Sequence, residues 1–64
     1  MTLKERRKSR GLTLKELAKL ADVSYVSIFH YENGNYKPKY EVAKKLADVF
    51  GCTVGEIMAG FDEK

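Results

Sequence analysis

The pattern Thr-Xaa-Xaa-Glu occurs three times in this chain, at residues 2–5, 13–16 and 53–56. In this pattern the threonine caps the start of a helix, and the glutamate three residues later reaches back to the threonine backbone. Together the two side chains satisfy N–H groups that the first helical turn leaves unpaired. Three such signals in 64 residues, with no sustained alternation of apolar and polar residues, predict an all-α domain.

Other residues mark the remaining helix boundaries. Ser24 can cap a further helix, and Asp22 before it tolerates a left-handed backbone conformation at a turn. Four glycines stand where a helix could end in a left-handed residue: Gly11, Gly34, Gly51 and Gly60. The expected helices of this single domain, residues 1–64, span about residues 2–10, 14–20, 25–32, 39–50 and 54–59.

Helical periodicity predicts which side chains face the core. Residues 14–20 would bury Leu17, Ala18 and Leu20, whereas residues 25–32 have only Ile28 and Tyr31 to bury. A helix with so small a buried face is held by its neighbours on one side, which leaves its other side free for a partner. The remaining expected core residues are Leu3, Val42, Ala43, Leu46, Ala47, Val49, Phe50, Val54, Ile57 and Met58.

Composition excludes several classes of protein. Cys52 is the only cysteine and His30 the only histidine, so an internal disulfide and a Cys/His zinc site are excluded, and we expect no cofactor. A lone cysteine fits a reducing cytosol, and we expect a cytoplasmic, nucleoid-associated protein without a signal peptide. No apolar run approaches the roughly 20 residues of a membrane helix. The chain also lacks a set of catalytic groups and room for a small-molecule pocket.

The charge is unevenly distributed. Residues 1–50 carry eleven Lys/Arg and six Asp/Glu, a balance of +5, whereas residues 51–64 carry one Lys and three acids, a balance of −2. A basic body with an acidic tail favours an anionic partner for the body, although ordinary solubilising charge is a simpler interpretation of net charge alone.

Only residues 21–24 separate the second expected helix from the third, which is typical of a helix-turn-helix. Several runs, in order along the chain, resemble the Cro/C1-type helix-turn-helix domain of phage and bacterial repressors and xenobiotic-response-element regulators. These runs are Arg10-Gly11-Leu12-Thr13, Glu16-Leu17-Ala18, Val23-Ser24, Ser27-Ile28, Tyr31-Glu32-Asn33-Gly34 and Lys37-Pro38. The resemblance covers nearly the whole chain and implies a compact five-helix, lambda-repressor-like domain that binds double-stranded DNA.

The resemblance implies that residues 25–32 lie in the major groove. Four side chains would face base edges, opposite Ile28: Tyr25, Val26, Phe29 and His30. The family commonly reads bases with Gln, Asn, Arg or Ser, so this face is unusually apolar. Val26 and Phe29 can pack on thymine methyl groups, which predicts a T-containing site. An alternative is that a partner or a bent helix covers Val26 and Phe29.

Contacts to the DNA backbone are expected on both sides of this helix. The expected residues are Lys15, Ser24, Ser27, Asn33, Asn35, Tyr36, Lys37 and Lys39, with Arg10 as a possible addition. For any single lysine, a merely solvated charge is an equally good interpretation.

The resemblance also implies a largely buried ion pair between Arg7 and Glu32, with a surface pair as the alternative. Two residues depart from the family pattern. Arg6 replaces an apolar residue of the first helix, and Lys39 replaces the Ser or Thr that caps the fourth. Both add positive charge near the expected DNA face, which suggests that stability was exchanged for phosphate affinity.

The leading functional hypothesis is a small transcriptional regulator, more specifically a repressor that occludes promoter DNA. We expect a weak homodimer on a two-fold operator, with Met58 and Phe61 as the candidate contact residues. The alternative is a protein-interaction module that binds a toxin or an antirepressor through Tyr25, Val26 and Phe29. An enzyme has no supporting residues.

Overall fold

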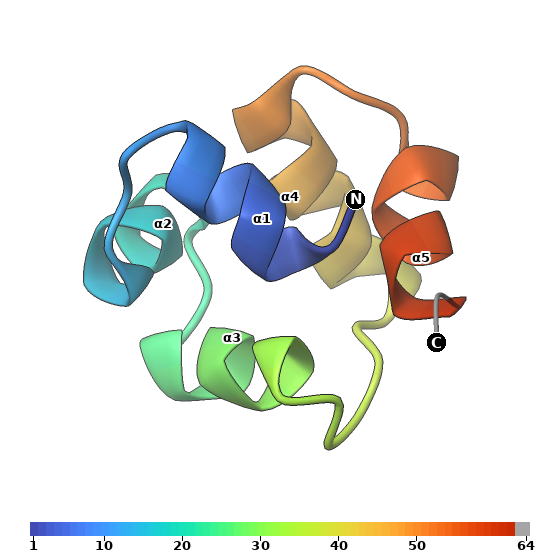
Figure 1. The fold of residues 1–64 in the computed structure, drawn as a ribbon, viewed down its shortest axis with the longest axis horizontal. Coiled ribbons are helices and arrows are strands. Elements are labelled where there is room, and N and C mark those ends of the chain that lie inside the picture. The colour runs from blue at the N-terminus through green and yellow to red at the C-terminus, as the bar shows by residue number, and fades with distance from the viewer. Residues whose placement is uncertain (63–64) are drawn as a thin grey trace.

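The computed structural model describes residues 1–62, which form five helices and no strand (Figure 1). The helices are α1 (Leu3–Ser9), α2 (Leu14–Ala21), α3 (Tyr25–Glu32), α4 (Tyr40–Phe50) and α5 (Val54–Asp62). The predicted all-α, five-helix fold is therefore confirmed, and the last two residues of the predicted domain lie outside the described part. None of the described helices is long and apolar enough to cross a membrane.

Reciprocal capping bonds start three of the helices. The Thr13 N–H donates to Glu16 Oε1 at 2.9 Å, and the Glu16 N–H donates to Thr13 Oγ1 at 3.1 Å. Thr2 with Glu5, and Thr53 with Glu56, make the same pair of bonds. The bond from the threonine backbone is the main reason why the pKa of each glutamate lies below its ordinary value. All three predicted capping boxes are thus present.

Left-handed residues end α2 and α4, where the sequence predicted them. Asp22 has a φ of 55° and Gly51 a φ of 65°, and both belong to the classes of residue that tolerate this conformation best. Gly60, in contrast, does not end a helix, because α5 continues to Asp62. A Cβ atom on Gly60 would lie 2.5 Å from the Met1 carbonyl oxygen, so this glycine allows the N-terminus to pack closely on α5.

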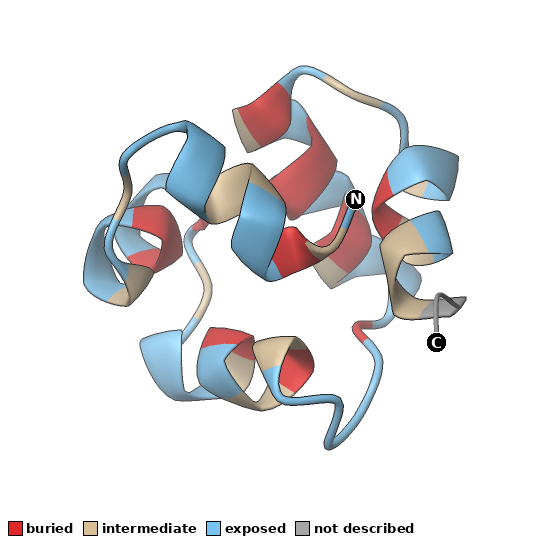
Figure 2. Cartoon of the chain, in the orientation of Figure 1, coloured by how far each residue is buried: buried red, intermediate tan, exposed pale blue. Residues whose placement is uncertain are grey.

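One core forms between the helices, and the buried faces in Figure 2 point toward it. Its buried apolar residues are Leu3, Leu17, Ala18, Ala21, Ile28, Tyr31, Ala43, Leu46, Ala47, Phe50 and Ile57. The prediction for Leu20 is wrong, since 61% of it is exposed and Ala21 takes the inward position. The centre of the buried face lies between Leu17, Ala18 and Ala21, and Leu20 is about 100° from it at 100° per residue.

α3 lies along one side of the molecule, at the bottom of Figure 1, against α1 and α2. Only Ile28 and Tyr31 of α3 are buried, as the sequence predicted. α4 packs against α2 and α5 and completes the core. This arrangement leaves the outer side of α3 without a covering element from residues 1–62 (Figure 2).

Candidate nucleic-acid interface

The outer face of α3 carries three large, half-exposed side chains. Tyr25, Val26 and Phe29 are 47%, 47% and 48% exposed. His30 is partly buried and follows Val26 by one helical turn, so it lies on the same face. The residues that the sequence predicted to meet DNA bases are therefore together on one surface, opposite the buried Ile28.

An ion pair fixes the C-terminal end of α3. The Arg7 Nε and Nη2 atoms donate to Glu32 Oε2 and Oε1 at 2.8 and 3.1 Å, and Arg7 Nη1 donates to the Leu12 carbonyl oxygen at 2.8 Å. The two side chains are only 11% and 6% exposed. The bonds to Glu32 are the main reason why the pKa of Arg7 is raised. The pair connects α1, the α1–α2 link and α3.

Lys15 and Ser24 lie beside the N-terminal end of α3. Lys15 Nζ, from α2, lies 5.5 Å from the centre of the Tyr25 ring, a favourable cation–π distance. The Ser24 hydroxyl oxygen accepts a hydrogen bond from the Val26 N–H at 3.3 Å and caps the helix. The hydroxyl proton of Ser24 is then still available to an acceptor such as a phosphate oxygen.

Residues 33–36 pack back on the other end of α3. Asn33 Nδ2 donates to the Phe29 carbonyl oxygen at 2.7 Å, and Asn35 Nδ2 lies 2.8 Å from His30 Nδ1. The Tyr36 ring lies 5.2 Å from the His30 ring between centroids. Both asparagines, expected only as phosphate contacts, therefore also order α3 itself. The Asn35–His30 contact joins residues five apart across a helix end, a spacing that no sequence pattern predicts.

The remaining predicted phosphate-contacting residues differ in exposure. Lys37 and Lys39 are exposed on either side of the buried Pro38. Ser27 is partly buried beside Tyr31: burial raises the pKa of the Tyr31 phenol, and the Ser27 hydroxyl opposes this shift. Ser27 therefore exposes less of its surface to a DNA backbone than the two lysines do.

Arg10, the possible addition to the DNA contacts, is used within the fold. Its Nη2 atom donates to the Phe50 carbonyl oxygen at 2.8 Å, and its guanidinium lies 5.7 Å from the centre of the Phe50 ring. Arg10 thus binds the C-terminal end of α4, where carbonyl groups are unpaired and a positive charge is favoured. No sequence pattern predicts this contact between residues forty apart.

A model of the helix-turn-helix family matches residues 3–57. This span covers α1 to α4 and the start of α5, including the α2–α3 pair described above. The chain belongs to the helix-turn-helix family, of the Cro/C1 type. Membership of this family implies DNA binding.

Relatives of this helix-turn-helix chain come from archaea and bacteria. A protein of Sulfurisphaera tokodaii named as an HTH-type transcriptional regulatory protein is 38% identical over 97% of this chain and 22% of its own length. The HTH-type transcriptional regulator DdrOP3 of Deinococcus deserti is 35% identical over 94% of this chain and 46% of its own length. The helix-turn-helix chain thus spans less than half the length of these relatives. No solved structure gives a significant match.

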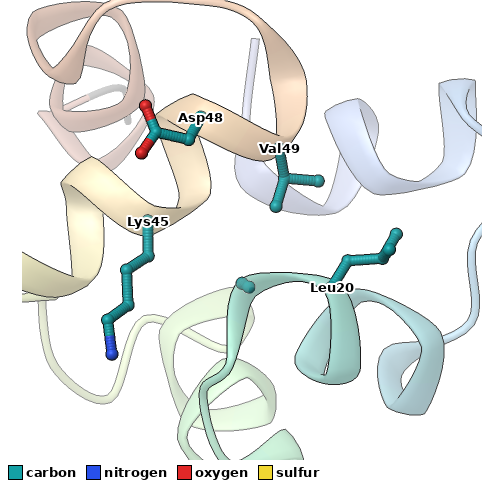
Figure 3. A pocket seen from close by; sticks show the side chains of 5 residues that line it. Leu20, Lys45, Asp48 and Val49 are labelled. Atoms are coloured by element: carbon teal, nitrogen blue, oxygen red, sulfur yellow. The ribbon is translucent and has the colours of Figure 1, made fainter.

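The helix-turn-helix domain also has a hollow between α2 and α4, away from the α3 face (Figure 3). Its lining residues are Leu20, Ala21, Lys45, Asp48 and Val49, with Leu20 on the α2 side and Val49 on the α4 side. Lys45 Nζ lies 3.5 Å from the Asp22 carbonyl oxygen, at the turn of the motif. None of these residues belongs to the predicted interface.

The two candidate dimer residues of this helix-turn-helix domain are only partly exposed. Met58 and Phe61 are both partly buried against the core. The Phe61 ring lies 6.4 Å from the Tyr31 ring in an edge-to-face arrangement. Phe61 therefore supports the inner side of α3, and only part of it is available to a second chain.

Proposed function

We propose that this domain binds double-stranded DNA sequence-specifically, with α3 in the major groove. The proposal rests on the solvent-facing surface of α3, which is made by Tyr25, Val26, Phe29 and His30. The only acidic residue of α3 is Glu32, and its charge is buried against Arg7. The outer face of α3 therefore presents no negative charge to a phosphate backbone.

Positive and hydrogen-bonding groups flank this face on both sides. Lys15 lies beside Tyr25 at the N-terminal end of α3, where Ser24 caps the helix, and the exposed Lys37 and Lys39 follow the C-terminal end of α3 along the chain. Helix N-termini and lysines both attract phosphate oxygens. Asn33, Asn35, Tyr36, Ser24 and Ser27 provide further donors in this proposed backbone contact.

Most of the contacts between α3 and the DNA bases would be apolar. Val26 and Phe29 are suited to thymine methyl groups, whereas Tyr25 and His30 supply hydrogen bonds. α3 has eight residues and is about 12 Å long, so it covers only a few base pairs. A short, mostly apolar contact of this kind supports modest specificity for a T-containing half-site.

The size of the domain supports a dimer on DNA. Its longest dimension is 25 Å, and half-sites one helical turn apart are about 34 Å from centre to centre. Two copies would therefore touch only at their edges. The partly exposed Met58 and Phe61 offer a small apolar contact, which fits a weak homodimer completed by DNA. Such a dimer would act in the cytosol, at the nucleoid, as a repressor by occluding promoter DNA.

Selection of duplexes from a random pool at moderate salt tests this proposal. We expect a two-fold, thymine-containing motif with half-sites one turn apart. Affinity for the selected site should fall steeply with salt, and K37Q and K39Q should each lower the logarithmic salt slope by about one. K44Q removes the same charge from α4, outside the proposed interface, and should leave the slope unchanged. Absence of an enriched sequence would contradict sequence-specific binding.

The half-exposed apolar side chains also support a second candidate, a protein-interaction module. An apolar protein interface depends little on salt, in contrast to phosphate contacts. Weak, unselective DNA binding together with a salt-insensitive protein complex that is lost on F29A would favour this alternative.

A further inference from the structure

The hydrogen bond between Asn35 and His30 determines where the imidazole carries its proton. The Asn35 Nδ2 and His30 Nδ1 atoms are 2.8 Å apart. An amide nitrogen can only donate a hydrogen bond, so His30 Nδ1 must accept it. A neutral imidazole has one proton on its two nitrogens. In this arrangement the proton of His30 is therefore on Nε2.

Two aromatic rings also contact the ring of His30. Phe29 contacts it edge-on with 5.6 Å between centroids, and Tyr36 lies tilted against it at 5.2 Å. Three contacts, from Phe29, Asn35 and Tyr36, thus restrict a side chain that has only two rotatable bonds. Within residues 1–62 no hydrogen bond engages Nε2.

This N–H donor lies next to the apolar part of the α3 face. His30 follows Val26 by four residues and Phe29 by one, so the three side chains form a continuous surface on the helix. Val26 and Phe29 offer no hydrogen bond to a base. His30 Nε2 is thus a fixed polar group at the C-terminal end of an otherwise apolar reading surface.

We propose that Asn35 fixes His30 as an Nε2–H donor, and that His30 thereby reads a guanine beside the thymines that Val26 and Phe29 contact. This proposal rests on the proposed function above. In the major groove guanine presents two neighbouring acceptors, N7 and O6. Cytosine presents an amino donor, adenine places an amino donor beside N7, and thymine places a methyl group beside O4. A lone N–H donor therefore favours guanine.

The two residues have different roles in this proposal. His30 contacts the base, whereas Asn35 is a positioning residue that acts through the imidazole. One net hydrogen bond corresponds to a preference for guanine of roughly three- to tenfold at that position. A carboxylate in place of the Asn35 amide would accept from Nδ1–H and move the proton, which leaves Nε2 as an acceptor.

The test therefore compares the unaltered chain with N35D by two measurements. The first is the ¹⁵N chemical shift of the two His30 ring nitrogens, measured at about pH 9. The second is duplex selection at the same pH. In the unaltered chain we expect a protonated Nε2, a bare Nδ1 and selection of guanine. In N35D we expect the two shifts to exchange and the selected base to change to adenine or cytosine, whose amino groups donate.

N33D is the matched control, because it makes the same change two residues away on an asparagine that contacts the Phe29 carbonyl and not His30. It should weaken binding to all sequences alike and leave both the shifts and the guanine preference unchanged. A protonated Nδ1 in the unaltered chain would overturn the proposal, as would a guanine preference that persists in N35D after the shifts have exchanged. If the unaltered chain selects thymines but no guanine, only this proposal fails, whereas absence of any selection overturns the proposed function as well.

Discussion

Arg7 and Glu32 form two parallel hydrogen bonds between guanidinium and carboxylate, at 2.8 and 3.1 Å, and both side chains are largely buried. This bidentate geometry fixes orientation as well as distance. Glu32 is the last residue of α3, and Arg7 also binds the Leu12 carbonyl oxygen just before α2. The pair therefore fixes α3 relative to the two helices that precede it, and with it the direction of the reading face.

Removal of Glu32 should destabilise the domain strongly. E32A leaves the Arg7 charge buried without its partner, which should lower the free energy of unfolding by about 3–5 kcal/mol. Urea denaturation followed by circular dichroism measures this change. E41A removes an exposed carboxylate from α4 and should change stability by less than about 0.5 kcal/mol. Equal losses in the two variants would contradict the buried-pair interpretation.

The capping boxes predict a loss of stability in acid. The pKa values of Glu5, Glu16 and Glu56 are lowered in the folded chain, mainly by hydrogen bonds from the Thr2, Thr13 and Thr53 backbones. A carboxyl group with a depressed folded-state pKa stabilises the fold above its unfolded-state pKa, and this contribution is lost as the pH falls through the folded-state pKa. We expect the melting temperature to decrease as the pH falls below about 4.5.

Glutamine at these three positions isolates that contribution. A glutamine side chain can still accept the bond from the threonine N–H, but it does not titrate in this range. The melting temperature of the triple variant E5Q/E16Q/E56Q should therefore change less between about pH 5 and pH 3 than that of the unaltered chain. An identical pH profile would show that other carboxyl groups cause the acid transition.

Local signals were sufficient to predict most of this fold. The Thr-Xaa-Xaa-Glu boxes, the Ser24 cap, and the left-handed Asp22 and Gly51 depend on residues at most a few positions apart. The face of α3 was predictable for the same reason, because helical geometry alone places Val26 opposite Ile28. The family pattern then indicated the one long-range contact that was predicted, between Arg7 and Glu32.

Contacts that depend on tertiary packing could not be predicted. Arg10 was expected near phosphate but binds the Phe50 carbonyl, since the end of α4 happens to pack beside it. Arg6 is expected near the DNA face, and its charge also contributes to the lowered pKa of Glu56 at the start of α5, after the hydrogen bonds from Thr53. Leu20 was assigned to the core because its helix has apolar residues around more than one face. In each case the sequence does not determine which neighbour the side chain meets.

Gly60 should be intolerant of a side chain, although it lies within a helix. In G60A the new Cβ atom would lie 2.5 Å from the Met1 carbonyl oxygen, a backbone atom. We expect a loss of about 1–3 kcal/mol, as for other overpacked sites, despite the higher helix propensity of alanine. Thermal unfolding measures this loss.

Gly55 provides the matched control in the same helix. A Cβ atom there meets only Thr53 Oγ1, at 3.8 Å, so alanine fits without displacing anything. G55A should therefore stabilise the domain by about 0.4–1 kcal/mol. If G60A were also stabilising, the close packing of the N-terminus on α5 would not contribute to the fold.

Substitutions at Lys39 and Arg6 should both increase stability, but only the one at Lys39 should weaken DNA binding. Lys39 occupies the N-cap of α4 with suitable extended backbone angles, φ −73° and ψ 165°, but its side chain makes no capping bond. K39S should therefore stabilise the domain by about 1 kcal/mol. If Lys39 contacts phosphate as proposed, the same variant should weaken DNA binding and lower the logarithmic salt slope by about one.

R6L should behave differently. Arg6 Nε is buried without a hydrogen-bond partner in the described part of the chain, and such a group costs about 1–3 kcal/mol. Leucine removes this cost, so R6L should raise the melting temperature. Because the charge of Arg6 acts on Glu56 at the start of α5, the DNA salt slope should not change. If R6L loses as much DNA affinity as K39S, Arg6 also contacts DNA. The hypothesis that stability was exchanged for phosphate affinity would then hold at both positions.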